Sequence, residues 1–179
     1  MGRSMNPGSF RPSSPFHMVW LATNRCNARC AHCSSNSSTP YPDELSQEEA
    51  CDLMDQFAEA GVVDLAISGG EPLLRQDLFE IIAHARSRGL SVGVGSNGAV
   101  LSQETAIRLV ESGINRFQVS LDGQAAEHEA LRCWNGLFDR ALQMIQRARE
   151  VGLRVHVCCT INRLNWQILE SFTELVSRL

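Results

Sequence analysis

The sequence predicts an α/β fold built on parallel β-strands. Short apolar segments alternate five times with longer segments of helical spacing, and glycines or polar clusters separate them. Because each strand is followed by a helix and a short connection, neighbouring strands must run parallel with right-handed crossovers. Active sites in such folds form at the carboxyl ends of the strands. The residues that directly follow the predicted strands are therefore the candidates for function.

The first two units have clear boundaries. Residues 17–22 (HMVWLA) predict the first strand, because the run is apolar and partly β-branched and aromatic. Ser46 and Glu49 form a capping box that predicts a helix start, and Gly61 is expected to end that helix. Residues 62–68 predict the second strand. The second helix has an apolar face made of Leu78, Ile81, Ile82 and Ala85.

The same alternation continues three more times. Apolar runs at residues 90–95, 114–121 and 153–161 predict three further strands. Ser102 is the expected cap of the helix after the first of these, and a longer connection leads to a helix at residues 137–151. The last expected helix is amphipathic and carries Trp166, Leu169, Phe172 and Val176.

Length and composition fit one soluble domain of 179 residues. Residues 1–15 are rich in Gly, Pro, Ser and Arg without periodicity, which predicts a flexible leader before a core domain at residues 16–179. A net charge of -4 disfavours a nucleic-acid partner. No apolar run approaches the roughly 20 residues that span a bilayer, and the N-terminus lacks the apolar core of a signal peptide. We therefore expect a cytoplasmic protein that acts on small molecules or peptides, without a membrane partner.

Three cysteines follow the first predicted strand at C-x3-C-x2-C spacing: Cys26, Cys30 and Cys33. One compact loop can direct three thiolates to a single centre, and three protein ligands leave one position of a metal centre open. A [4Fe-4S] cluster held in this way has one iron without a protein ligand. A zinc site with His32 is an alternative, although the adjacent His32 and Cys33 suit one tetrahedral ion poorly. A disulfide with a spare thiol is another, although nothing indicates an oxidising compartment.

Four motifs at successive strand ends resemble those of the radical S-adenosylmethionine (radical SAM) superfamily. They are the C-x3-C-x2-C loop, Gly-Gly-Glu-Pro at 69–72, Ser-Asn-Gly at 96–98 and Ser-Leu-Asp-Gly at 120–123, in that order. The string that follows, with His128-Glu, Leu131-Arg132 and residues 136–140 (GLFDR), is most similar to the branch that matures peptides, sulfatases and peptide-derived cofactors.

The resemblance implies a partial TIM-like barrel of six βα units, of which five are visible in this sequence. Members of this branch usually carry a C-terminal cysteine-rich SPASM domain. With neither a sixth strand nor such a domain in view, we expect a fragment of a longer enzyme or a truncated homologue, with the fifth strand as an uncovered edge.

The resemblance also implies the chemistry. Cys26, Cys30 and Cys33 would hold a [4Fe-4S] cluster whose fourth iron binds the amino and carboxylate groups of S-adenosylmethionine. Reductive cleavage of this cosubstrate gives a 5'-deoxyadenosyl radical that abstracts hydrogen from an organic substrate, expected to be a peptide or a cofactor precursor. An external electron donor of the flavodoxin or ferredoxin type is the implied partner. The alternative is a non-catalytic iron-sulfur scaffold or partner-binding module.

The Gly-Gly-Glu motif is expected to contact the cosubstrate. Gly69 and Gly70 lack side chains, so the backbone can approach it closely, and Glu71 can accept a hydrogen bond from its ammonium group. The alternative is a plain strand-to-helix turn with a carboxylate near a helix start.

The later motifs supply further expected contacts to S-adenosylmethionine. Ser96 and Asn97 follow the third strand, and Asn97 is expected to offer its side-chain amide. Ser120 and Asp122 are expected to bind polar groups of the cosubstrate, Asp122 most naturally a ribose diol. Arg132 is expected to pair with the methionine carboxylate, and its alternative is a solvated helix arginine.

Several positions depart from the family pattern. His32 stands where an aromatic residue often packs against the adenine. Cys133 stands where glycine is common, and we interpret it as a tolerated substitution. The alternative is a changed loop or an extra thiol near the substrate. Cys158 and Cys159 end the fifth strand, so one side chain should face the barrel and the other the helices. Cys51 lies in a helical pattern and is interpreted as a small buried apolar residue.

Overall fold

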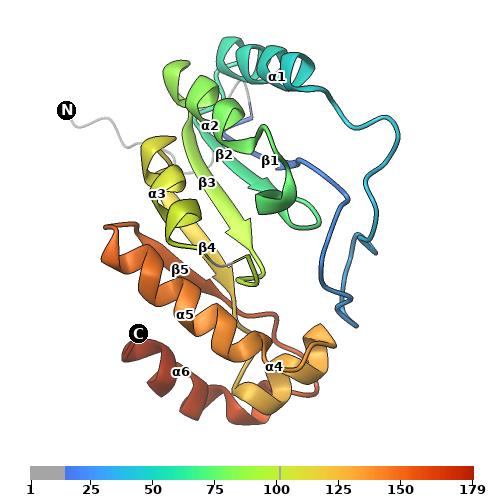
Figure 1. The fold of residues 1–179 in the computed structure, drawn as a ribbon, viewed down its shortest axis with the longest axis vertical. Helices are drawn as coiled ribbons and strands as arrows, with labels where there is room; N and C mark the ends of the chain where they lie inside the picture. Colours follow the sequence, from blue (N-terminus) through green and yellow to red (C-terminus); the bar gives the residue numbers. More distant parts are fainter. Residues whose placement is uncertain (1–14, 101) are drawn as a thin grey trace, which may run out of the picture.

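The structure is a computed structural model that describes residues 15–100 and 102–179. Its five strands form one sheet in the order β1-β2-β3-β4-β5, and every neighbouring pair is parallel (Figure 1). The strands are β1 His17–Leu21, β2 Asp64–Ser68, β3 Ser91–Ser96, β4 Arg116–Ser120 and β5 Val155–Cys158. The predicted parallel α/β architecture is confirmed. The expected leader lies outside the described residues except for Pro15.

Six α-helices occur within the described residues. They are α1 Gln47–Glu59, α2 Leu78–Ser87, α3 Gln103–Glu111, α4 Ala125–Arg132, α5 Leu137–Glu150 and α6 Leu169–Ser177, with single 3-10 turns at Pro72–Leu74 and Trp166–Ile168. The capping box predicted at Ser46 and Glu49 is present. The sequence patterns did not predict α4, which occupies the long connection after β4.

One face of the sheet forms the core. In Figure 1, α2, α3 and α5 follow one another along this face. The side chains beneath them alternate along the strands and are almost fully buried: Leu65, Ile67, Val92, Val94, Phe117 and Val119. Burying one such apolar side chain contributes about 1.5–3 kcal/mol. The helices therefore cover the face that carries the apolar residues of each strand.

The opposite face of the sheet carries a cluster of charged side chains at its amino end. Arg116 on β4 reaches across Gly93 on β3 to Asp64 on β2, and Nη2 of the arginine lies 2.8 Å from Oδ2 of the carboxylate. Nδ1 of His17 on β1 lies 2.5 Å from the same carboxylate oxygen. These three side chains lie at the first residues of their strands. They tie β1, β2 and β4 together at the amino end of the sheet.

The cysteine loop lies against α4. The connection between β1 and α1 runs along the side of the sheet and comes beside α4 near the carboxyl ends of the strands (Figure 1). There the backbone N–H of Ala31 donates to the carbonyl oxygen of Leu131 at 2.8 Å. Two segments a hundred residues apart thus form one wall of the rim. Among the described residues, no helix is both long and apolar enough to cross a membrane.

Candidate active site

A cavity of about 390 Å³ opens at the carboxyl ends of the strands. The three motif cysteines, Cys26, Cys30 and Cys33, line it from the loop after β1. Six of the predicted cosubstrate residues line the same cavity: Gly69, Gly70, Ser96, Asn97, Ser120 and Arg132. The remaining two, Glu71 and Asp122, are fully buried behind its wall. Topology therefore brings all four motifs to one rim.

The three thiols fit an iron-sulfur cluster better than a single metal ion. Among the described residues, no three His, Cys, Asp or Glu side chains are grouped so as to hold one ion. A [4Fe-4S] cluster makes no such demand, because each thiolate binds a different iron. His32, the possible zinc ligand, instead has its Nε2 3.6 Å from Oδ2 of Asp122. All seven cysteines are free thiols, so the disulfide alternative is not realised.

The thiols differ in their electrostatic surroundings. Burial raises the pKa of Cys26 and of Cys30, although Arg132 favours the thiolate of Cys30. Desolvation also opposes ionisation of Cys33, but hydrogen bonds from Ser35 and from nearby backbone outweigh it and lower the pKa of this exposed thiol. Metal binding releases protons from such thiols, since only thiolates are ligands. A cluster held by these thiols would therefore release protons as it assembles.

Glu44 organises the start of the cysteine loop. Its carboxylate accepts hydrogen bonds from the Thr23 hydroxyl at 2.9 Å, from the backbone N–H of Asn24 at 2.6 Å and from that of Tyr41 at 3.0 Å. These bonds lower the pKa of Glu44, against the desolvation that opposes its ionisation. The sequence patterns did not single out Glu44, because a carboxylate in a polar connection has no periodic or motif context.

The two glycines of the Gly-Gly-Glu turn make room for the cysteine loop. A Cβ atom at Gly70 would lie 2.3 Å from the carbonyl oxygen of Arg25, and one at Gly69 would lie 2.4 Å from that of Thr23. The backbone N–H of Gly70 donates to the Thr23 oxygen at 2.7 Å. The glycines therefore allow the turn after β2 to dock on the loop after β1. Their close approach to the cosubstrate stays a prediction.

Glu71 connects this turn to Asn97. Its two carboxylate oxygens accept from the backbone N–H of Leu73 at 3.3 Å and from that of Asn97 at 2.7 Å. Complete burial raises the pKa of Glu71 to about 7 in spite of these bonds. The side-chain amide of Asn97 in turn donates to Oδ1 of Asn27 in the cysteine loop at 2.8 Å. Glu71 thus holds the segment that reaches the loop, and its expected bond to the ammonium group stays a prediction.

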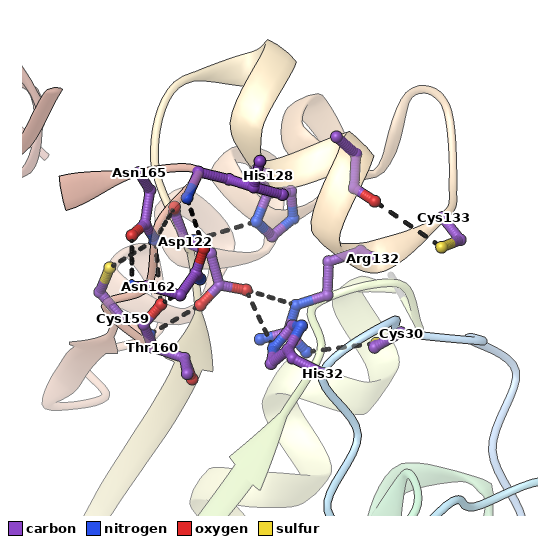
Figure 2. Close-up of polar contacts among 12 residues, drawn as sticks. Cys30, His32, Asp122, His128, Arg132, Cys133, Cys159, Thr160, Asn162 and Asn165 are labelled. Carbon is purple, nitrogen blue, oxygen red and sulfur yellow. Dashed lines mark hydrogen bonds and ion pairs between the residues drawn. The ribbon is translucent and has the colours of Figure 1, made fainter. Parts of the chain in front are cut away.

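Asp122 links three segments around the rim (Figure 2). Its carboxylate accepts from Nε of Arg132 at 2.7 Å and from the backbone N–H of Thr160 at 2.8 Å. Its main-chain oxygen accepts from Nδ2 of Asn165 at 2.7 Å, and its main-chain N–H donates to Nδ1 of His128 at 3.1 Å. Asp122 thereby joins β4, α4 and the connection after β5. Its expected contact to a ribose stays a prediction, since both carboxylate oxygens already have protein partners.

Arg132 is not a solvated surface residue. Its side chain is 11% exposed and forms an ion pair with the buried Asp122, so the alternative of a solvated helix arginine is wrong. Nη1 also lies 3.7 Å from the sulfur of Cys30, and the guanidinium lines the cavity. Its pairing with a methionine carboxylate stays a prediction.

Three residues around Asp122 were not among the predicted site residues. His128 belonged to the quoted motif string without a role, and it is fully buried, with its pKa lowered to about 4 by burial and by the nearby Arg132. Thr160 and Asn165 belong to the connection after β5. Thr160 has a signal in the sequence, because it lies in the Cys-Cys-Thr-Ile-Asn stretch at the end of the fifth predicted strand, whereas Asn165 lies beyond that stretch.

The positions that depart from the family pattern behave largely as expected. Cys158 is exposed and pairs in register with Ser120, whereas Cys159 packs against the core, so the predicted alternation is confirmed. Cys51 packs half-buried against the core. Cys133 has φ 53° and ψ 39° at the end of α4, which is the left-handed conformation that glycine adopts without strain.

A partial barrel of parallel strands, with three cysteines after the first strand and a Gly-Gly-Glu turn after the second, defines a class of cluster-dependent enzymes. Residues 20–176 match the family model of the Radical SAM superfamily. The chain therefore belongs to this superfamily, and the sequence-based assignment is confirmed.

Two curated relatives with similar sequence identity to this chain carry the names of enzymes. The chain is 33% identical over 164 residues to the AdoMet-dependent heme synthase of Oleidesulfovibrio alaskensis, covering 90% of this chain and 42% of the relative. It is 34% identical over 167 residues to the mycofactocin maturase MftC of Mycobacterium tuberculosis, covering 92% and 42%. The chain thus spans less than half the length of these relatives.

Solved structures of low sequence identity share the fold. The crystal structure of Streptococcus suis SuiB bound to S-adenosylmethionine superposes with a TM-score of 0.79 at 18% identity, over 92% of this chain and 38% of that one. The structure of anSMEcpe with bound AdoMet gives a TM-score of 0.75 at 18% identity, over 90% and 48%. The predicted partial TIM-like barrel is confirmed.

Proposed function

We propose that this chain is the cluster-binding core of an enzyme that cleaves S-adenosylmethionine reductively. Cys26, Cys30 and Cys33 would hold a [4Fe-4S] cluster through three of its irons. The chemistry that this group supplies when bound is one electron to the sulfonium, which breaks the carbon-sulfur bond to give methionine and a 5'-deoxyadenosyl radical. This radical would abstract hydrogen from an organic substrate.

The residues of this chain would position the cosubstrate and keep water away from it. Gly69, Gly70, Ser96 and Ser120 present small or hydroxyl-bearing groups to the cavity. Arg132 presents the guanidinium that suits a carboxylate, and Asn97 presents an amide beside the cysteine loop. The cavity volume of about 390 Å³ is within the range of small-molecule sites.

One observation carries the proposal: three cysteines and the residues of three other motifs line a single cavity at the carboxyl ends of the strands. Parallel α/β folds use this edge for ligands and catalysis. The motifs lie on segments separated by up to a hundred residues, so their convergence depends on the fold.

The substrate is proposed to be a peptide or a cofactor precursor. The relatives support this class by name, since they include the maturase MftC and the sporulation killing factor maturation protein SkfB of Bacillus subtilis. SuiB, a structural neighbour, has been solved with its precursor peptide SuiA. An external donor of the flavodoxin or ferredoxin type is proposed to deliver the electron.

The test is anaerobic reconstitution of the chain with iron and sulfide, followed by dithionite and S-adenosylmethionine. We expect release of 5'-deoxyadenosine, measured by liquid chromatography. The triple variant Cys26→Ala, Cys30→Ala, Cys33→Ala should bind no cluster and release none, because it lacks all three ligands. Cys51→Ala is the matched control, since this thiol lies in α1 outside the cavity, and it should behave as the wild type. Equal product from the triple variant would contradict the proposal.

The second candidate is a non-catalytic iron-sulfur scaffold or partner-binding module. The cavity lined by the three cysteines fits this candidate too, because cluster binding needs the thiols and not cleavage of the cosubstrate. Titration calorimetry of the reconstituted protein with S-adenosylmethionine separates the two. A bound cluster without heat of binding would support the scaffold, whereas binding followed by cleavage supports the enzyme.

A further inference from the structure

The guanidinium of Arg132 lies between a buried carboxylate and the sulfur of Cys30 (Figure 2). Nε donates to Oδ2 of Asp122 at 2.7 Å, and Nη1 lies 3.7 Å from the Cys30 sulfur. Within residues 15–100 and 102–179, Cys30 is the one cluster cysteine whose sulfur contacts a cationic side chain. The side chains of Arg132 and Asp122 are 11% and 0% exposed, so little water screens this contact.

The guanidinium is held in this place from two sides. Asp122 is fixed by the backbone N–H of Thr160, by the Asn165 amide and by the His128 ring. On the other side, the backbone N–H of Ala31 in the cysteine loop donates to the carbonyl oxygen of Leu131 in the last turn of α4. Ala31 adjoins Cys30, and Leu131 adjoins Arg132. Arg132 therefore cannot turn away from Cys30 without loss of buried hydrogen bonds.

We infer that Arg132 is a positioning residue that raises the reduction potential of the cluster bound through Cys30. This inference rests on the proposed function. Reduction adds one negative charge to the cluster, and a fixed positive charge against a ligand sulfur stabilises the reduced state relative to the oxidised state. Hydrogen bonds to the sulfurs, local charge and solvent exposure are the features by which proteins set the potentials of such clusters. The carboxylate of Asp122 lies on the far side of the guanidinium, so it offsets this effect only in part.

The test is a potentiometric titration of the reconstituted full chain without S-adenosylmethionine, followed by the electron paramagnetic resonance signal of the reduced cluster. We expect Arg132→Gln to lower the equilibrium constant for reduction about tenfold, which is about 59 mV for a one-electron couple. Because the signal comes only from loaded molecules, partial loading does not distort the comparison. Arg132→Lys keeps the charge but lacks the two separate nitrogens that contact Asp122 and Cys30, so its potential should fall between those of the wild type and Arg132→Gln.

Arg29→Gln is the matched control. Arg29 is exposed in the same loop and donates to the backbone oxygens of Cys26 and Ala28, not to a sulfur. Its charge acts on Cys26 as the smallest of the effects on that thiol and is solvated, so its removal should shift the potential much less than removal of the Arg132 charge. Equal shifts in Arg29→Gln and Arg132→Gln would contradict a specific role for the Cys30 contact.

The outcomes separate this inference from the proposed function. A wild-type chain that binds no cluster overturns both. A wild-type cluster with the same potential in Arg132→Gln overturns the inference alone and leaves the proposed function standing. If Arg132→Gln loads no cluster, Arg132→Lys decides: a lower potential than the wild type supports the inference, and an equal potential overturns it.

Discussion

Cys133 holds a backbone conformation that L-residues with a Cβ atom disfavour. It closes α4 at φ 53°, and the glycines at 61, 89 and 152 have similar angles directly after helices. The left-handed conformation costs a non-glycine residue about 1–2 kcal/mol. Glycine is common at this position in the family because the end of the helix requires a left-handed backbone conformation.

We expect Cys133→Gly to stabilise the metal-free chain by about 0.5–1 kcal/mol. Relief of the strained angle outweighs the greater chain entropy that glycine brings to the unfolded state. Urea denaturation under reducing conditions measures the change. Cys133→Ala retains a Cβ atom and should leave the free energy of unfolding nearly unchanged, and a stabilisation by alanine as large as that by glycine would refute the explanation.

At the residue scale, the sequence could predict the side chains that belong to motifs after strands. Cys26, Gly70 and Asn97 are recognisable because strand ends and spacing mark them. The sequence could not show that Glu44 fixes the cysteine loop. Such a role depends on donors from two segments of the chain, residues 23–24 and Tyr41, and single-residue chemistry does not reveal which carboxylate they will meet.

At the scale of elements, Gly93 on β3 leaves room for the side chain of Arg116 on β4 to reach Asp64 on β2. A Cβ atom at Gly93 would lie 2.6 Å from Nε and 2.8 Å from Cγ of Arg116. The stem of the arginine would therefore have to leave its path across β3. Its ion pair with Asp64, which keeps the pKa of that carboxyl below its usual range, would then be lost.

We expect Gly93→Ala to destabilise the chain by about 1–3 kcal/mol, in the range of steric overpacking. Gly95→Ala is the matched control on the same strand and face, because the nearest atom to its Cβ would be 3.8 Å away. Thermal denaturation should show a lower Tm for Gly93→Ala and no comparable decrease for Gly95→Ala. In an Asp64→Asn background the cost of Gly93→Ala should shrink, since the ion pair is already removed.

The predicted elements were found where hydrophobic periodicity was strong, and their ends shifted by a few residues. α4 is the exception, and its composition explains why. The helix Ala125–Arg132 buries only His128 and Leu131, too few apolar positions for a recognisable period. Contacts of these residues with Asp122 and the cysteine loop determine where it lies.

At the scale of the whole molecule, two buried groups give the stability opposite dependences on pH. Glu71 has a folded pKa of about 7 against an ordinary value of 4.5, so its contribution is present below pH 4.5 and is lost as the pH rises toward 7. His128 has a folded pKa of about 4 against 6.5, so its contribution is present above pH 6.5 and is lost as the pH falls toward 4. Between pH 4.5 and 6.5 the two contributions offset each other.

Two variants should separate these contributions in the metal-free chain. Relative to the wild type, the free energy of unfolding of Glu71→Gln should rise from pH 4.5 to 6.5, and that of His128→Gln should fall. Each change should be about 2 kcal/mol, because one pKa unit corresponds to about 1.4 kcal/mol and each group is already half-titrated in the unfolded chain at one end of this range. Urea denaturation at several pH values measures both, and profiles parallel to the wild type would refute the assignment.

The convergence of the four motifs could be predicted because parallel topology places all strand ends at one edge. Which residues face the cavity and which support its wall could not. Asp122 is fully buried because α4 and the connection after β5 pack around it, and no strand pattern encodes that packing. The sequence motifs thus predicted where the site lies, whereas tertiary contacts determine which motif residues face the cavity and which support its wall.

The bond between Ala31 and Leu131 has a consequence for biosynthesis. A ribosome adds roughly 5–20 residues per second, so about 5–20 s pass between emergence of the sulfur-bearing loop and emergence of the helix that covers it. During that interval the nascent thiols remain open to oxidants and to stray metals. If this loop holds the proposed cluster, delivery of iron and sulfide by the cell is therefore best timed after Leu131 has emerged from the ribosome.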